Sequence, residues 1–189
     1  MNQKEIQLIQ KAQKGDTRAF ELLICQHDKR ILQLACHMLG NMQDAQDVYQ
    51  ETLMRAFQGL PAFAFQCQFS TWLLRITINL CINQYRKRRI QKLLFTYNTQ
   101  KDLPDDFISK DARPDEKVIV KEMTQHLERA MQSLSAKQRM VFTLKHFYGY
   151  KLSEIAEITN SAVGTIKNDL YRATHKLQKL LHPYVKMSE

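Results

Sequence analysis

Hydrophobic residues recur every three or four positions over most of the chain, which is the period of an amphipathic α-helix. The pattern is clearest from about Ala162 to beyond Lys176. Its apolar stripe consists of Val163, Ile166, Leu170, Ala173, Leu177 and Leu180. The opposite face carries Gly164, Asn168, Tyr171, Arg172 and His175, with Thr165 and Lys167 on its flank. The pattern therefore predicts a long helix with one buried face and one polar, net basic face.

A shorter helix is predicted just before it, from about Ser153 to Ile158, with Ser153 as its N-cap. The three residues 159–161, Thr-Asn-Ser, separate the two helices and are typical of a turn. A short helix, a tight turn and a longer basic helix indicate a helix-turn-helix, whose second helix enters the major groove of DNA. The alternative is an ordinary helical hairpin with a solvated polar face.

The same period predicts helices in the rest of the chain. They cover residues 5–14, 18–39, 43–58, 70–94, 117–131 and 136–148. Expected N-caps are Asp16 or Thr17, Ser70 or Thr71, and Ser135. Phe57 and Phe147 are among the residues expected to face the core.

Composition agrees with an all-α fold. Hydrophobic residues make up 44% of the 189, enough for a core, and only 5 Gly and 4 Pro interrupt the helices. Residues 96–116 differ, with two prolines, six acids and few aliphatic side chains, which predicts a flexible linker. We therefore expect two small helical domains, at 1–95 and 117–189, the second a four-helix domain that contains the helix-turn-helix.

The net charge of +9 favours a polyanionic partner. The four cysteines, Cys25, Cys36, Cys67 and Cys81, form no C-x-x-C pair, so we expect buried free thiols, with a redox or metal sensor as the alternative. No secretory leader or membrane span is visible, which predicts a cytoplasmic protein. We expect no cofactor, no metal and no catalytic residues, because there is no phosphate-binding glycine loop, metal cluster or nucleophile triad.

Acidic residues form a stripe on one predicted helix of this basic chain. Asp44, Asp47 and Glu51 stand at positions i, i+3 and i+7 of the helix 43–58. Such a face suits a basic protein surface and not DNA, although a merely solvated face is the alternative.

An aromatic loop and a basic helix follow. Residues 62–68 are predicted as a loop, and Phe63, Phe65, Phe69 and Trp72 lie in or beside it. The next helix carries Ser70, Asn79 and Asn83, and it ends in the basic run Arg86, Lys87, Arg88 and Arg89. Asn amides pair with base edges, Arg and Lys neutralise phosphates, and aromatic rings stack on unpaired bases. Core packing of Trp72 and the phenylalanines, and a solvated basic helix end, are the alternatives.

Taken together, these segments resemble one family. DAQDVYQETLMRAF and FSTWLLRITINLCINQYRKRR are similar to region 2 of bacterial sigma factors, and LSAKQRMVFTLKHFYGYKLSEIAEITNSAVGTIKNDLYRATHKL is similar to region 4. Their order and spacing, over about residues 10–183, resemble the extracytoplasmic-function (ECF) group. The resemblance implies a region 2 domain at 1–95, a linker at 96–116 and a region 4 domain at 117–189.

The resemblance also implies partners and roles. The partners would be core RNA polymerase, through its β′ clamp helices and β flap, promoter DNA as duplex and melted non-template strand, and an anti-sigma factor. Asp44, Asp47 and Glu51 would dock on the clamp helices. Phe63, Phe65, Phe69, Ser70, Trp72, Asn79, Asn83, Arg86, Lys87, Arg88 and Arg89 would bind the −10 element, where a flipped base is captured. Lys167, Asn168 and Arg172 would contact the bases or nearby phosphates of the −35 element, and Thr165 and Lys176 its phosphates.

Two departures from the family's pattern concern sequence preference. Asn168-Asp169 follows Lys167 where the family often has Ser-Arg, and Asp169 could accept from a cytosine amine or pair with a nearby lysine. The loop also carries Cys67 and no charge. Two rival functions are a stand-alone dimeric helix-turn-helix regulator and a DNA-processing enzyme with an appended helix-turn-helix.

Overall fold

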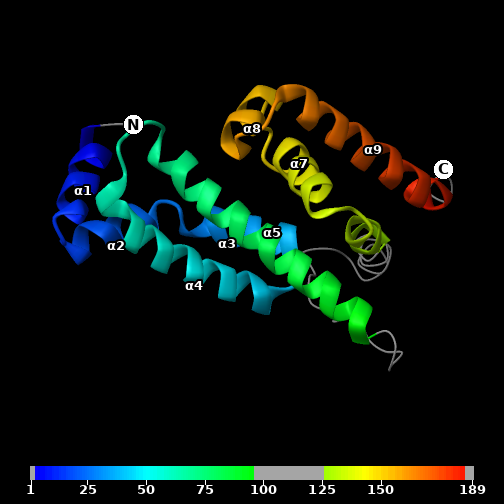
Figure 1. The fold of residues 1–189 in the computed structure, drawn as a ribbon, viewed down its shortest axis with the longest axis horizontal. Helices are drawn as coiled ribbons and strands as arrows, with labels where there is room; N and C mark the ends of the chain where they lie inside the picture. Colours follow the sequence, from blue (N-terminus) through cyan, green and yellow to red (C-terminus); the bar gives the residue numbers. More distant parts are fainter. Residues whose placement is uncertain (1–2, 96–125, 186–189) are drawn as a thin grey trace, which may run out of the picture. The chain divides into compact units, whose positions relative to one another are not determined.

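The protein is all-helical wherever its structure is described. The computed structural model describes residues 3–95 and 126–185, and it contains helices and no strand within these ranges. The chain divides into two compact units, Met1–Gln91 and Lys92–Glu189 (Figure 1). The predicted all-α class is confirmed. The predicted linker 96–116 and the helical pattern of residues 117–125 lie outside the described residues.

The first unit contains five α-helices and one short 3₁₀ turn in its described part. In chain order they are α1 (Gln3–Gln13), α2 (Thr17–Cys25), α3 (Asp28–Leu39), α4 (Met42–Gly59), η1 (Leu60–Ala62) and α5 (Phe69–Phe95). Asp16 caps α2 as predicted, because its carboxylate accepts a hydrogen bond from the Ala19 amide at 3.0 Å. Gly40 ends α3 in the left-handed conformation, with φ 73°, and Asn41 then caps α4. The helix predicted to begin after Ser70 or Thr71 begins earlier, at Phe69.

One predicted helix is divided in two. The pattern predicts a single helix over residues 18–39, but the chain turns at Gln26 and His27 between α2 and α3. The His27 ring packs against Phe69 of α5, with 5.5 Å between ring centroids. The turn lets Leu23 and Ile31, on opposite sides of the break, both enter the core. This correction follows from tertiary packing, because the sequence here contains no Gly or Pro to mark a break.

Burial of His27 gives a testable pH dependence. Burial lowers the pKa of His27 below 6.5; Arg30 also lowers it, while Glu5 and Asp28 oppose the shift. Because the folded state disfavours the protonated ring, the stability contribution is present above pH 6.5 and is lost as the pH falls. We expect the urea midpoint to drop between pH values of about 7.5 and about 5.5, and His27→Gln to flatten that drop. An equal slope in wild type and variant would contradict this, and His175→Gln, on an exposed face, is the control.

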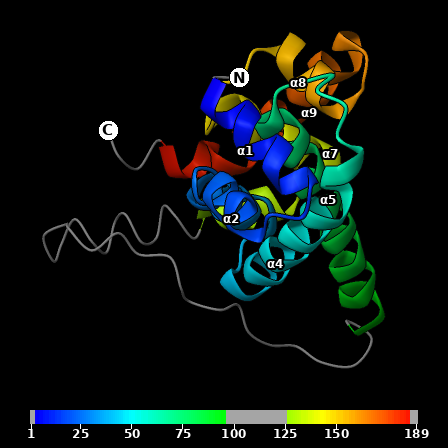
Figure 2. The ribbon, with the colours of Figure 1, turned by 90° about the vertical axis from the view of Figure 1, so that its left-hand side faces the viewer.

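The core of the first unit lies where α1, α2, η1 and the start of α5 meet. Its fully buried side chains include Ile9, Leu23, Leu60, Phe69 and Leu73. α4 contributes Ala45, Val48, Thr52 and Ala56 to the buried set, as predicted. Phe57 was wrongly placed in the core: its side chain is 44% exposed and meets Phe20 edge to face at 5.1 Å. α4 and α5 run antiparallel along the unit (Figures 1 and 2).

The second unit has four helical segments in its described part. They are residues 126–132, α7 (Ala136–His146), α8 (Leu152–Thr159) and α9 (Val163–Val185). Ser135 caps α7 as predicted, and Gln138 completes a capping box with it. Ser153 was wrongly predicted as the cap of α8, which begins at Leu152; there the Glu154 carboxylate accepts from the Lys151 amide at 2.7 Å.

The turn between α8 and α9 depends on Asn160. Its φ of 49° and ψ of 50° place it in the left-handed region that Asn tolerates better than most residues. The α9 stripe is buried in its middle, at Ile166, Ala173 and Leu177, and exposed at its predicted ends, Val163 and Leu180. Phe147 is also largely exposed and was wrongly placed in the core. Within residues 3–95 and 126–185, no helix combines the length and apolar character needed to cross a membrane.

Candidate functional site

Four aromatic rings form a cluster where the loop after η1 leads into α5. The Phe63 ring lies 5.1 Å from Phe65, 6.0 Å from Phe69 and 5.1 Å from Trp72, and Phe69 lies 5.6 Å from Trp72, all between centroids. Such separations suit tilted or edge-to-face aromatic pairs. The structure therefore brings the four aromatic residues that the sequence singled out into mutual contact.

The rings differ in what they expose. Phe63 and Phe69 are buried, Trp72 is half-buried and Phe65 is 36% exposed. Phe65 also adopts a positive φ of 55°, which is unusual for a bulky side chain and indicates a backbone position that the surroundings impose. Phe65 and the exposed part of Trp72 are thus available to a ligand, whereas the rings of Phe63 and Phe69 belong to the core and are corrected from the predicted −10 contacts.

Two residues that the sequence did not single out hold this loop in place. The Gln13 amide donates to the carbonyl oxygens of Leu60 at 3.1 Å and Phe63 at 2.9 Å. Gly59 lies against the Trp72 ring, and a Cβ atom there would come within 3.3 Å of it. The sequence carries only a weak signal for either contact, because a lone Gln on a helix and a Gly at a helix end occur in most helical proteins.

Cys67 lies in the same loop. The Arg75 guanidinium, on the first half of α5, is 3.9 Å from the Cys67 sulfur. Cys81 is buried and Cys36 is half-buried, in agreement with the expected structural thiols, whereas Cys25 is exposed. None of the four forms a disulfide within the described residues.

The polar face of α5 continues away from the aromatic cluster. Asn79, Asn83 and Arg86 are exposed, and their spacing of four and three residues places them on one side of the helix. Ser70 lies elsewhere, half-buried beside His27 and Leu74 in a small cavity. The structure therefore joins Asn79, Asn83 and Arg86 and separates Ser70 from them.

The basic run at the end of α5 is divided. All four residues are exposed, but Arg88, whose side chain is 48% exposed, also forms an ion pair with the buried Asp44 carboxylate of α4. Arg88 lies about 160° around the helix axis from Arg86, so the two cannot serve one face. Four consecutive basic residues in the sequence do not form a single surface patch.

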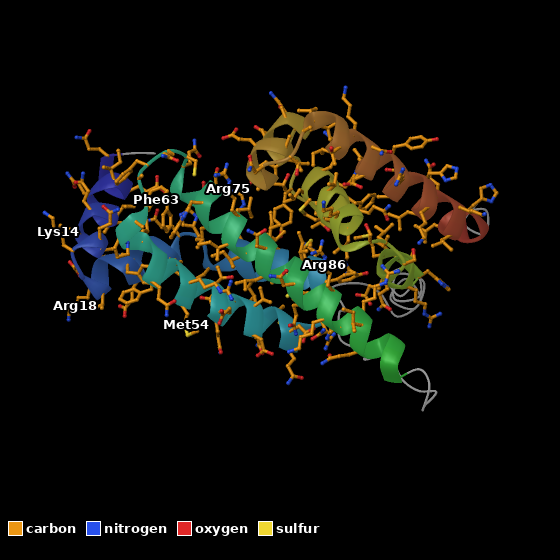
Figure 3. All side chains as sticks on the ribbon, in the orientation of Figure 1. Lys14, Arg18, Met54, Phe63, Arg75 and Arg86 are labelled. Atoms are coloured by element: carbon orange, nitrogen blue, oxygen red, sulfur yellow. The ribbon has the colours of Figure 1, made fainter. Side chains whose placement is uncertain are left out.

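The acidic stripe on α4 is also divided. Asp47 is exposed and Glu51 is half-buried, but Asp44 is only 6% exposed. The prediction of a three-residue acidic face is thus corrected to two. Met54 lies seven residues, or about two helical turns, beyond Asp47 and therefore on the same side of α4. Its side chain is 56% exposed and points away from the neighbouring helices (Figure 3). Glu51 is partly neutralised by Arg55 of the same helix, whose Nε lies 2.6 Å from its carboxylate.

The inner side of α4 is fastened to α3. The Tyr49 hydroxyl donates to Asp28 at 2.7 Å. Burial, then the hydrogen bond and charge of Asp28, raise the pKa of Tyr49 to about 12, so the phenol stays protonated near neutral pH. This hydrogen bond fixes α4 against α3 and so helps to hold the outward face of α4 in position.

The polar face of α9 is open to solvent. Thr165, Lys167, Asn168 and Arg172 are exposed, and Tyr171 stacks on His175 at 6.1 Å on the same face. Lys176 differs, because its amine donates to the Ser133 carbonyl at 2.7 Å, beside the end of the helical segment 126–132. Thr165, Asn168 and Arg172 thus share one open side of α9, whereas Lys167 lies exposed on the opposite flank, about 160° around the helix axis from Thr165, and Lys176 has a partner within the chain.

Comparison with known proteins assigns these surfaces to a family. Residues 23–90 match the family described as Sigma-70 region 2, and residues 124–177 match Sigma-70, region 4. The RNA polymerase sigma-H factor of Pseudomonas aeruginosa is 31% identical over 187 residues, covering 97% of each chain. The ECF RNA polymerase sigma factor SigW of Bacillus subtilis is 32% identical over 176 residues, covering 92% of this chain and 94% of SigW.

Solved structures agree on the fold. CnrH, in complex with the cytosolic domain of CnrY, aligns with a TM-score of 0.66 at 24% identity and covers 96% of this chain and 99% of its own. The sigma factor RpoE of Bartonella quintana, in complex with the anti-sigma factor NepR, aligns with a TM-score of 0.65 at 24% identity, covering 86% of this chain and 96% of its own. The matches to both sigma-70 regions, together with the relatives at 31% and 32% identity, show that the chain belongs to the ECF subfamily of the sigma-70 family of RNA polymerase sigma factors.

Proposed function

We propose that this chain binds core RNA polymerase and directs promoter-specific initiation, reading the −35 element as duplex and melting the −10 element by trapping a base. The observation that best supports this is the separation of three exposed surfaces of different chemistry. α4 carries an acidic and apolar face, the loop and α5 carry aromatic, amide and basic groups, and α9 carries a basic, hydrogen-bonding face. A polymerase subunit that positions promoter DNA needs both protein-binding and DNA-binding faces.

The α4 surface is proposed to dock on the β′ clamp helices. Asp47 and Glu51 supply the negative charge. The exposed Met54, about one turn beyond Glu51, supplies an apolar contact. Interface centres favour Met and aromatic side chains, while charges at the rim guide orientation. Asp44, being buried, takes no direct part.

The aromatic loop and α5 are proposed to hold the melted −10 element. Phe65 and Trp72 offer ring surface to an unstacked base, and Asn79, Asn83 and Arg86 follow on along α5. Extruding a base costs a few kcal/mol, so the site must be formed in advance to offset it. The hydrogen bonds from Gln13 to the loop support that pre-formed shape.

The remaining proposals follow from the family. Two proteins similar in fold were solved with a partner: the sigma factor RpoE with the anti-sigma factor NepR, and CnrH with the cytosolic domain of CnrY. We propose that an anti-sigma factor sequesters this chain too. The chain itself performs no covalent chemistry, since the polymerase supplies the catalytic centre, and it acts in the cytoplasm, where its polymerase and promoters are.

The proposal is tested by mixing the purified full chain with core RNA polymerase that lacks any sigma factor. Co-elution in gel filtration, followed by selection of transcribed promoters from random templates, is the expected result. Failure to co-elute at low salt, with a homodimer that still binds duplex DNA, would reject the sigma role and favour the stand-alone regulator.

Replacing Arg172 by glutamine is expected to weaken binding to the selected −35 duplex by about 5- to 100-fold, the range of one lost bidentate base contact. Specificity at one base pair should relax at the same time. Lys176→Gln removes the same charge but from an amine bound to the Ser133 carbonyl, so its effect should stay within about twofold. Fluorescence anisotropy across a salt series measures both. Equal losses in the two variants would contradict the assignment.

A further inference from the structure

A buried carboxylate joins the two helices to which the docking and −10 surfaces belong. Asp44 Oδ2 accepts a hydrogen bond from the Asn41 amide at 3.0 Å and pairs with Arg88, and Asp44 Oδ1 accepts from the Gln84 amide at 3.1 Å. Gln84 and Arg88 stand one turn apart on α5, so one carboxylate on α4 holds two successive turns of α5. We call these four residues the Asp44 cluster.

The cluster lies where α5 leaves the core. The first half of α5 is anchored by buried side chains that include Phe69, Leu73, Ile78 and Cys81. From residues 82 to 91 the side chains are half-buried or exposed, without a fully buried one among them. In this stretch the polar contacts to Asp44 tie α5 to the start of α4, which runs antiparallel beside it (Figure 1).

The proposed −10 residues straddle this boundary. Asn79 belongs to the core-anchored half of α5, whereas Asn83 and Arg86 belong to the stretch beyond Cys81. Gln84 and Arg88 lie on the opposite side of the helix from Arg86. The cluster therefore leaves the DNA-facing side open while it fixes the direction of the helix that carries it.

We propose that Asp44 is a positioning residue for −10 recognition: through Gln84 and Arg88 it fixes the distal part of α5, so that Asn83 and Arg86 stay aligned with the aromatic loop. Arg88 on this view contacts no phosphate. The effect on DNA binding rests on the proposed sigma function. The ordering of the distal part of α5 by Asp44 is a property of the free protein and does not depend on that function. Ordering the DNA-binding groups before contact lowers the entropic cost of binding.

The structural part is tested by hydrogen–deuterium exchange on the free, full-length chain. Asp44→Asn keeps the size of the side chain and removes its charge. We expect amides of residues 84–91 to exchange about tenfold faster or more, with residues 69–81 unchanged. Glu21→Gln, which removes one charge from an exposed position on α2, should change neither stretch. Unchanged exchange at 84–91, or a uniform rise over both stretches, would overturn the proposal.

The functional part uses holoenzyme formed with core polymerase in excess. The probe is a labelled single-stranded oligonucleotide carrying the −10 sequence that wild-type holoenzyme selects from a random pool. We expect Asp44→Asn to weaken binding about three- to tenfold, although removing a negative charge would by electrostatics alone strengthen binding to DNA. Arg88→Gln should weaken it similarly without changing the salt slope, and the double variant should match either single one.

A phosphate contact by Arg88 would give the opposite results. If Arg88 bound a phosphate, Arg88→Gln would reduce the salt slope by about 0.7 for single-stranded DNA, as we expect for Arg86→Gln. Asp44→Asn would then release Arg88 and strengthen binding, and either result overturns the proposal. Failure of wild type to bind core polymerase would instead reject the proposed function, and the exchange experiment would still decide the role of Asp44 in the fold.

Discussion

Replacing Phe69 by alanine is expected to lower the free energy of unfolding of the first unit by about 3–5 kcal/mol. The Phe69 side chain is fully buried and packs with Leu23, Leu60 and Leu73. It also touches the rings of Phe63, Trp72 and His27. Removing it leaves a cavity at the point where three helices and the aromatic loop meet, and the fixed surroundings cannot collapse to fill it. Urea unfolding monitored by circular dichroism measures the loss.

The neighbouring ring provides the matched control. Phe65 is partly exposed at the loop surface, so Phe65→Ala should cost less than about 1 kcal/mol of stability. It should instead weaken binding of the −10 single strand by about 5- to 100-fold, the range of one lost base–aromatic stack. If Phe69→Ala left stability intact and reduced only DNA binding, the division of the cluster into core and contact rings would be wrong.

Reversing the charge at Asp47 is expected to weaken binding of core RNA polymerase by about 100-fold, equivalent to about 3 kcal/mol. Asp47 is exposed on the outward face of α4, in line with Met54. Asp47→Arg removes an attraction to the proposed basic docking surface and adds a like-charge repulsion. Because the side chain is outside the core, the unfolding midpoint should barely change. Competition gel filtration against labelled wild type measures the affinity.

Glu21→Arg makes the same charge change on α2, at another exposed position, and should leave polymerase binding within about threefold. Asp44→Arg would not serve as a control, since it places a cation beside Arg88 and disrupts the fold. Equal weakening by Asp47→Arg and Glu21→Arg would mean that net charge, and not a docking face, governs the interaction.

Much of this protein follows from local sequence. The three- and four-residue spacing of apolar side chains is enough to place α4, α7 and α9, because a helix buries one stripe whatever it packs against. Ser135 as a cap and the turn at Asn160 follow from side-chain chemistry that acts within a few residues. The polar face of α9 could also be predicted from the local pattern, because polar side chains opposite the apolar stripe face solvent and need no contact with a distant segment.

Other features depend on contacts between distant segments. His27 interrupts a helical pattern because it packs on Phe69, 42 positions away, and no nearby residue signals that contact. Local patterns were enough to specify an all-α chain of two units with acidic, aromatic and basic elements in the ECF order. Which members of each element reach the surface depends on tertiary packing. Asp44 belongs to the predicted acidic stripe and Arg88 to the basic run, yet the two form an ion pair with each other. The buried Asp44 carboxylate needs hydrogen-bond donors, and α5 brings Gln84 and Arg88 close enough to supply them.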